Sequence, residues 1–203
     1  RYFTLLSGIN TFAILTYVAN APRLYRGAFG IEGAAFRWLR AFLAGRRIRI
    51  IHRSQHSPWH GISGGVPQGA VLSPFLFLVY IDDLAREVPP MRGGGASCEL
   101  LMFADDIAVA GSYSGHIGDK QLARLLPLFA KWFSRWRLLA NAKKSQVVCF
   151  SRRRDRPTPR VDFLLGEKKL DLVESYRYLG LTYHRSLRWH AHVDTTARYV
   201  HLA

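Results

Sequence analysis

Acidic residues and cysteines are scarce in this sequence. Its 203 residues contain 14 aspartates and glutamates against 29 lysines and arginines, so the formal net charge at pH 7 is +15. This charge does not define a fold, but it favours a polyanionic partner, nucleic acid above all. The alternatives are a protein that is merely basic and a fragment whose acidic part is missing.

The chain has only two cysteines, Cys98 and Cys149, whose spacing fits neither a metal site nor a disulfide framework. We therefore expect a reducing compartment, either the nucleus or the cytoplasm. Residues 3–21 carry no charge, as a membrane span would require, but polar side chains dilute the run. A packed strand and helix describes it better, so we expect no membrane association. Because the chain starts at Arg1 and ends without a recognisable terminus, we interpret it as a fragment.

Two adjacent carboxylates, Asp105 and Asp106, lie between the apolar runs 100–104 and 107–110. The runs predict a buried β-hairpin with the acids at or beside its turn. A merely acidic turn is the simpler interpretation, because aspartate tolerates turn geometry. Two ionised carboxylates about 5 Å apart, however, repel by roughly 3 kcal/mol at an effective dielectric constant of about 20. The pair therefore calls for a cation, and hard oxygen ligands select Mg²⁺ or Mn²⁺.

A glycine-rich loop over residues 64–69 precedes an apolar helix. Its small residues let the backbone approach a substrate closely, Pro67 stiffens the turn, and Gln68 can hydrogen-bond a base or a sugar edge. An ordinary loop before a helix is the alternative. Ser73 is predicted to cap a helix over 74–87 that is apolar on all sides and hence buried.

The remaining periodic segments predict further elements. They are helices over 34–45 and 119–139, strands over 48–53 and 146–150, a hairpin around Gly166-Glu167, and a strand over 176–183 broken at Gly180. Arginines cluster after the first of these helices and in a later loop, at Arg46, Arg47, Arg49, Arg53 and residues 152–156. A solvated basic face and phosphate contact both remain open interpretations of these arginines.

Four short motifs occur in the order of a known family. They are Gly65-Val66-Pro67-Gln68-Gly69 (motif B), Phe103-Ala104-Asp105-Asp106 (motif C), Asn141-Ala142-Lys143-Lys144-Ser145 (motif D) and the box Tyr178-Leu179-Gly180. On these residues the chain resembles the reverse transcriptase domain of non-LTR (LINE-type) retrotransposons, over about residues 60–185. Each motif alone is weak, whereas the ordered set is specific.

The resemblance implies an α+β fold, a palm whose antiparallel sheet carries the acidic hairpin and has helices packed on one face. The palm is expected over residues 1–185, with 1–31 as a degenerate motif A region. The start of a thumb is expected over 186–203, and the fingers are missing.

The resemblance also implies RNA-templated DNA synthesis, in which two Mg²⁺ ions steady the attacking and leaving oxygens. Asp105 and Asp106 are then catalytic metal ligands; because strand side chains alternate between faces, we expect Asp105 to be the primary ligand and Asp106 to support it. Lys144 is expected to protonate the departing pyrophosphate, unless it is only a surface lysine. The residues expected to position template and nucleotide are Gly65, Pro67, Gln68, Gly69 and Phe103. The expected partners are an RNA template, a DNA primer and deoxynucleoside triphosphates, and the cofactor is Mg²⁺ or Mn²⁺.

The family's motif A, which carries a catalytic aspartate, commonly within an Ala-Phe-Asp triplet, is not intact. Its triplet aligns near Ala13-Ile14-Leu15, and residues 1–31 contain no acidic residue. We therefore expect a reverse transcriptase fragment that does not polymerise DNA at a useful rate. The rival interpretation is a non-catalytic protein, either a decayed retroelement product or an RNA-binding scaffold with a palm fold. The abrupt loss of likeness before Gly30 points to a frame disruption or a misassigned exon ahead of that residue.

Overall fold

The structure of the chain is a computed structural model that describes residues 2–6, 9–10, 29–62, 64–88, 91–93, 96–112, 117–141, 143–151 and 159–201. Its residues belong to two units. Unit 1 comprises Arg1–Ile9, Leu84–Phe133 and Ala140–Ala203, and unit 2 comprises Asn10–Asp83 and Ser134–Leu139. The expected domain boundary at residue 185 falls inside unit 1 and stays a prediction. Among the described helices, none is long and apolar enough to cross a membrane.

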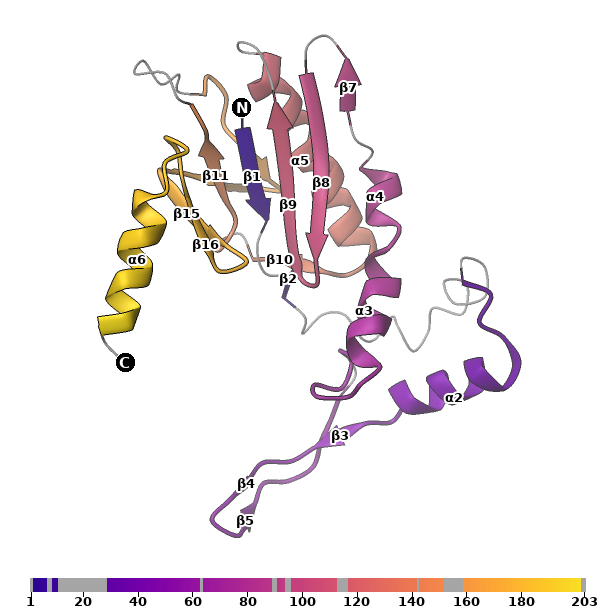
Figure 1. Cartoon of the computed structure of the whole chain (residues 1–203). Helices are drawn as coiled ribbons and strands as arrows, with labels where there is room; N and C mark the ends of the chain where they lie inside the picture. Colours follow the sequence, from indigo (N-terminus) through magenta and orange to yellow (C-terminus); the bar gives the residue numbers. More distant parts are fainter. Residues whose placement is uncertain are drawn as a thin grey trace. The chain divides into compact units, whose positions relative to one another are not determined.

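Unit 1 is built on a six-stranded sheet (Figure 1). In sheet order its strands are β14 (Asp171–Val173), β11 (Gln146–Cys149), β1 (Tyr2–Leu6), β9 (Asp106–Ser112), β8 (Ala96–Phe103) and β7 (Met91–Gly93). The β11–β14 ladder is parallel, and the other ladders of this sheet are antiparallel. The predicted hairpin with two aspartates at its end is confirmed as β8–β9, and the predicted α+β class is confirmed with it.

Helix α5 (Ile117–Arg135) lies behind β8 and β9 in Figure 1. Its buried apolar residues recur at helical spacing: Leu122, Leu125, Leu126, Phe129, Trp132 and Phe133. The predicted helix extended to residue 139. It ends at Arg135 because Arg137 has a left-handed backbone (φ 53°), which a right-handed helix cannot contain.

Two hairpins follow the sheet strands in unit 1. In the predicted hairpin around Gly166-Glu167, β12 (Leu164–Leu165) pairs with β13 (Lys168–Lys169). The segment predicted as one strand broken at Gly180 is a hairpin instead, because Leu179 and Gly180 both have positive φ (48° and 85°), the type I′ turn geometry. Its strands are β15 (Ser175–Tyr178) and β16 (Leu181–His184).

The remaining described elements are two helices and two short strands: α4 (Leu84–Glu87), α6 (His190–His201), β2 (Ile9–Asn10) and β10 (Leu139–Ala140).

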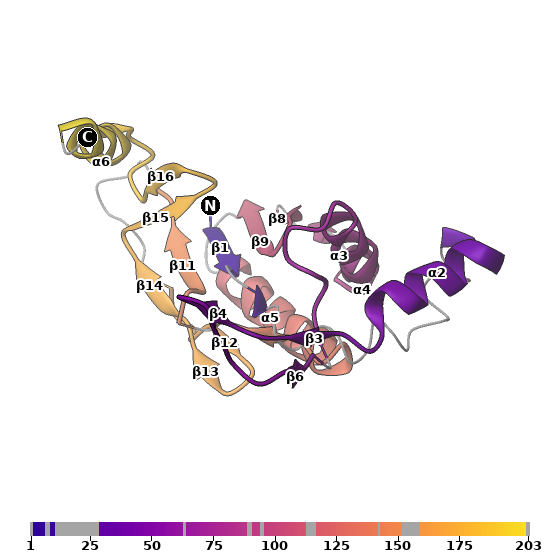
Figure 2. The ribbon, with the colours of Figure 1, turned by 90° about the horizontal axis from the view of Figure 1, so that it is seen from below.

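The described residues of unit 2 form two helices and a two-stranded ribbon. The ribbon leads on from the end of α2 (Gly33–Leu43), as Figure 2 shows. It consists of β3 (Arg47–Ile48) paired with β6 (His60–Gly61), and of β4 (Ile51–His52) paired with β5 (Gln55–His56). The glycine-rich loop connects β6 to α3 (Ser73–Ile81).

Helix α3 differs from its prediction in three respects. The expected helix over 74–87 is divided into α3 and α4. Ser73 does not cap it, because its hydroxyl donates a hydrogen bond to the carbonyl of Pro67 (2.5 Å) in the preceding loop. Phe75 and Leu78 are half exposed rather than buried. Its opposite face is fixed by Tyr80, whose hydroxyl donates to the carbonyl of Trp136 (2.5 Å) while the two rings meet edge to face.

Candidate active site

The two aspartates occupy different positions in the hairpin. Asp105 is the second of two turn residues and is exposed, whereas Asp106 opens β9, pairs with Phe103 and is half-buried. Ala104, the first turn residue, has φ 50°, a left-handed conformation that costs an alanine roughly 1 kcal/mol. Asp105 therefore projects from a strained turn, and Phe103, which is 61% exposed, lies directly before that turn.

The strand next to the acidic hairpin in the sheet is β1. It pairs with β9 in antiparallel register, so that Leu5 faces Ala108 and Leu6 faces Ile107, the neighbour of Asp106. Strand β1 has the sequence Tyr2-Phe3-Thr4-Leu5-Leu6 and contains no acid. The stretch 13–15, where the motif A triplet was expected, lies outside the described residues. In the described part of this sheet, the strand beside Asp106 therefore offers no second carboxylate.

Tyr178 connects the β15–β16 hairpin to the strand that carries Asp106. It is 8% exposed and packs on Ala108 of β9, with Tyr176 and Tyr183 packed against the pair. Burial raises the pKa of the Tyr178 phenol, and the negative charge of Asp106 raises it further. The sequence placed Tyr178 in a motif but did not indicate this contact, although the alternation of Tyr176 with Tyr178 was a visible sign of a shared face.

The motif D segment is a tight turn held by Asn141. The backbone amide of Lys144 donates to the Asn141 carbonyl (3.0 Å), and the buried Ser145 donates to the same oxygen through its hydroxyl (3.0 Å). The hydroxyl of Tyr176 donates to the carbonyl of Lys144 (3.3 Å). This turn is thereby linked through Tyr176 to the cluster on β9, while the Lys144 side chain remains exposed.

The glycine-rich loop belongs to unit 2 and is held from both sides. Gly65 and Gly69 have φ values of 78° and 79°, which explains glycine at these two positions. On one side Ser73 binds the Pro67 carbonyl, as described above. On the other side the Arg46 guanidinium donates to the carbonyls of Gly64 (3.2 Å) and Gly65. Gln68 stays exposed between these two attachments.

Arg46 has a role that the sequence did not reveal. It was grouped with the arginines open to phosphate contact, but its Nε also donates to the Leu43 carbonyl (3.1 Å), so its guanidinium is occupied by backbone oxygens. Burial lowers the pKa of Arg46, and the carbonyls offset this loss of hydration. A single arginine cannot be assigned to loop support or to phosphate contact from sequence, because the choice depends on residues 18 and 19 positions away.

Comparison with protein families gives the decisive match. The family model described as "Reverse transcriptase (RNA-dependent DNA polymerase)" matches residues 25–183. This chain belongs to the reverse transcriptase family. The matched range includes the glycine-rich loop, the acidic hairpin, Lys144 and Tyr178, and it begins after β1.

Curated relatives identify the type of reverse transcriptase. The "Probable RNA-directed DNA polymerase from transposon X-element" of Drosophila melanogaster is 33% identical over 78% of this chain and 17% of that protein. The "RNA-directed DNA polymerase from mobile element jockey" of the same organism is 30% identical over 76% of this chain and 17% of its own length. The R2 retrotransposable-element Pol polyprotein of Popillia japonica is 32% identical over 59% of this chain and 17% of its own length. The chain is thus a partial reverse transcriptase domain of LINE-type elements, and it spans less than a fifth of these relatives.

Reverse transcriptases generally use divalent metal ions, so we tested whether the residues present fit them. Asp105 and Asp106 are suitable oxygen ligands, but the described residues contain no group of three or more His, Cys, Asp or Glu side chains that could hold a metal. A pair of ions bridged by carboxylates from two strands needs at least one more acid. In the described part of this reverse transcriptase, the ligand set is therefore incomplete.

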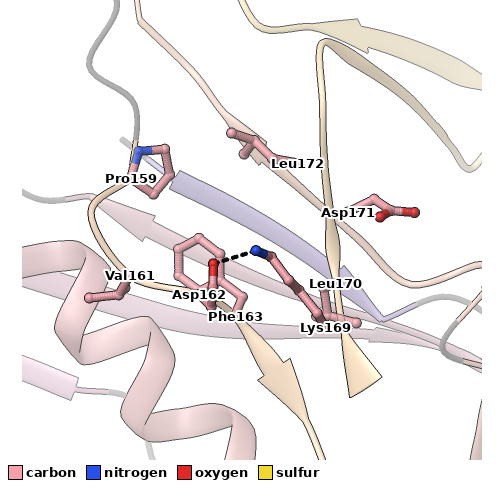
Figure 3. A pocket seen from close by; sticks show the side chains of 8 residues that line it. All are labelled: Pro159, Val161, Asp162, Phe163, Lys169, Leu170, Asp171 and Leu172. Carbon is pink, nitrogen blue, oxygen red and sulfur yellow. Dashed lines mark ion pairs between the residues drawn. The ribbon is translucent and has the colours of Figure 1, made fainter. Parts of the chain in front are cut away.

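A shallow pocket of about 250 Å³ lies elsewhere in unit 1 (Figure 3). Its apolar lining includes Phe163 and Leu170, and Lys169 contacts Asp162 across it (Nζ to Oδ1, 2.6 Å). Both ion-pair side chains are more than 60% exposed, so the pair adds little stability. None of the predicted site residues lines this pocket.

Proposed function

We propose that this chain is the palm region of a LINE-type reverse transcriptase, that it binds a primed RNA template, and that as written it does not add nucleotides at a useful rate. One observation carries the proposal: β1, which pairs with the Asp106 strand on the side opposite β8, contains no acid. Removing one member of a catalytic unit can cost several orders of magnitude in kcat.

The proposed roles of the site residues follow their exposure. Asp105, exposed in the turn, is the primary ligand for Mg²⁺ or Mn²⁺, and the half-buried Asp106 supports it. These ions, when bound, would neutralise charge on the reacting phosphate. Lys144 is the proposed proton donor to pyrophosphate. The proposed contacts to template and nucleotide come from Phe103 beside the hairpin and from Gly65, Pro67, Gln68 and Gly69 in the loop.

The domain assignment is part of the same proposal. We propose that the palm extends over residues 1–185, with 1–31 as a degenerate motif A region, and that the thumb begins within 186–203. The proposal includes a frame disruption or a misassigned exon ahead of Gly30, and the start of the family match at residue 25, after β1, supports it. Reading the encoding DNA in all three forward frames tests this: a frame with an Asp-bearing motif A supports it, and three frames without one contradict it.

The rival function is a non-catalytic RNA-binding scaffold with the same fold. The incomplete ligand set supports the absence of catalysis that this rival requires. The glycine-rich loop, the acidic hairpin and the motif D turn support descent from a polymerase. A side-by-side experiment tests the proposal: binding of a primed RNA template, and nucleotide incorporation into that primer with Mg²⁺ or Mn²⁺. We expect binding without incorporation, whereas failure to bind the primed template would contradict the proposal.

A further inference from the structure

The basic ribbon, defined as residues 46–61, lies in a long stretch without acids. Residues 33–81 contain six arginines and no aspartate, glutamate or lysine. The ribbon carries four of those six arginines; Arg47 and Arg53 are exposed, and Arg49 is half-buried. No carboxylate within this stretch can neutralise them, so their charge is available to an anionic partner.

A β-bulge sets the direction of the side chains in the basic ribbon. Two residues, 49 and 50, face three residues, 57–59, between the β3–β6 and β4–β5 ladders. Pro58 fits in the bulge because no ladder hydrogen bond is required of it there. The amide of Ser57 donates to the Ile50 carbonyl, and the Ile50 amide donates to the Ser57 hydroxyl (both 2.9 Å), which closes the bulge.

The bulge brings Trp59 to the arginine face of the basic ribbon. The register of Arg47 with Gly61 and of Ile48 with His60 puts Trp59 across from Arg49. The Cζ atoms of Arg49 and Arg47 lie 4.7 Å and 5.8 Å from the Trp59 ring centroid, within cation–π distance. Trp59 is nevertheless 55% exposed. Ile48 and Ile50 alternate with these arginines and therefore belong to the opposite face.

The turn at the tip of the basic ribbon contains an arginine in a strained backbone conformation. Arg53 and Ser54 form the two-residue turn and have φ values of 45° and 66°. This type I′ geometry favours Asn-Gly, so an arginine here costs roughly 1 kcal/mol. The arginine face thus carries Arg47, Arg49 and Trp59, and the exposed Arg53 forms the tip.

We infer that the basic ribbon is a binding element for single-stranded nucleic acid, in which Arg47, Arg49 and Arg53 contact phosphates and Trp59 stacks on an unpaired base. An exposed aromatic ring among cations is the combination by which proteins hold single strands, because only unpaired bases offer a free face. A duplex would engage the arginines but not the ring. The inference extends the proposed binding of a primed template, and it requires neither metal nor polymerisation.

The test measures binding of a labelled oligouridine RNA and of a blunt RNA–DNA hybrid to the full chain, with a chelator present. We expect Trp59→Ala to weaken oligouridine binding about tenfold and hybrid binding less than twofold. Trp38→Ala is the matched control, because Trp38 is also 55% exposed but stacks on Phe42. Equal losses for the two variants, or for the two probes, would overturn the inference.

A charge-matched pair of variants tests the arginines separately. Replacing Arg47 and Arg49 by glutamine should make the salt dependence of oligouridine binding shallower by about 1.4, which is 0.7 per phosphate contact. Replacing Arg37 and Arg40 on α2 by glutamine removes the same charge and should leave that slope unchanged. Identical slopes for the two pairs would contradict a role for the basic ribbon.

Photo-crosslinking of the unmodified chain to oligouridine avoids any folding defect of a variant. Mass spectrometry should find the cross-link on Trp59, and cross-links confined to other residues would overturn the inference. These tests can contradict the role of the basic ribbon without contradicting the proposed function. The proposed function is contradicted only if a primed template is not bound at all or if nucleotides are added.

Discussion

The acidic hairpin of unit 1 and the basic ribbon of unit 2 differ in how their function depends on single residues. The hairpin is supported by β9, which is buried on both faces, and its chemistry requires acids from two strands to meet at one point. The basic ribbon is exposed, and its charge is spread over several arginines. In the proposed roles, loss of one acid would abolish catalysis at the hairpin, whereas loss of one arginine would only weaken binding by the basic ribbon. Binding can therefore outlast catalysis in a chain of this kind.

The largest expected effect concerns salt. If the chain neutralises six or more phosphates, raising salt from about 50 to 200 mM should weaken binding of an RNA–DNA hybrid about 10³-fold or more. Asp105→Asn and Asp106→Asn should leave this slope unchanged, because neither acid contacts phosphate without a metal. Fluorescence anisotropy over a salt series measures it, and a salt-independent affinity would contradict the role assigned to charge.

The two regions should also differ in how much a tryptophan contributes to the free energy of unfolding. Trp132 of α5 is 1% exposed, so Trp132→Ala should lower the free energy of unfolding by about 3–5 kcal/mol. Trp59→Ala in the basic ribbon should cost no more than about 1 kcal/mol, the value of an exposed cation–π contact. Urea denaturation followed by circular dichroism gives both numbers, and similar costs would show that the basic ribbon is part of the core.

Alkaline pH should destabilise the sheet of unit 1. Burial, with the charge of Asp119 as a smaller cause, raises the pKa of the Cys149 thiol on β11 from 9.0 to about 12. The unfolded thiol ionises near pH 9 while the folded one stays protonated, so stability is lost as pH rises from about 9 to 12, by up to about 4 kcal/mol. Cys149→Ala should remove this part of the loss. An unchanged pH profile for Cys149→Ala would refute the assignment.

The smallest expected effect is an asymmetry between the two acids. Asp105→Asn should weaken Mn²⁺ binding about tenfold, because it removes the exposed charged ligand, and Asp106→Asn should weaken it less. Calorimetric titration of Mn²⁺ into each variant measures the difference. Equal losses, or no loss from either, would show that the turn does not distinguish the two acids.

The sequence predicted those features that depend on local pattern. The hairpin with Asp105 and Asp106 followed from apolar runs around a turn, and the fold class followed from the order of the motifs. The structure adds that motif D is a turn in which the Asn141 carbonyl accepts hydrogen bonds from the next few residues.

The features that the sequence missed depend on distant residues. The contact of Tyr178 with Ala108 joins segments 70 residues apart, and the attachment of Arg46 to Gly64 and Gly65 joins an arginine to carbonyls that show no sequence signal. Ser73 was read as a cap because its pattern fits one, but the Pro67 carbonyl competes for its hydroxyl. Backbone acceptors of this kind are defined only by the fold.

The most direct test of the central claim is extension of a labelled primer on an RNA template by the unmodified chain, with Mg²⁺ and then Mn²⁺. We predict that the primed template is bound and that no nucleotide is added, because β1, the strand beside β9 on the side opposite β8, carries no acid. Extension that Asp105→Ala abolishes would contradict this prediction, since another residue would then supply the missing ligand.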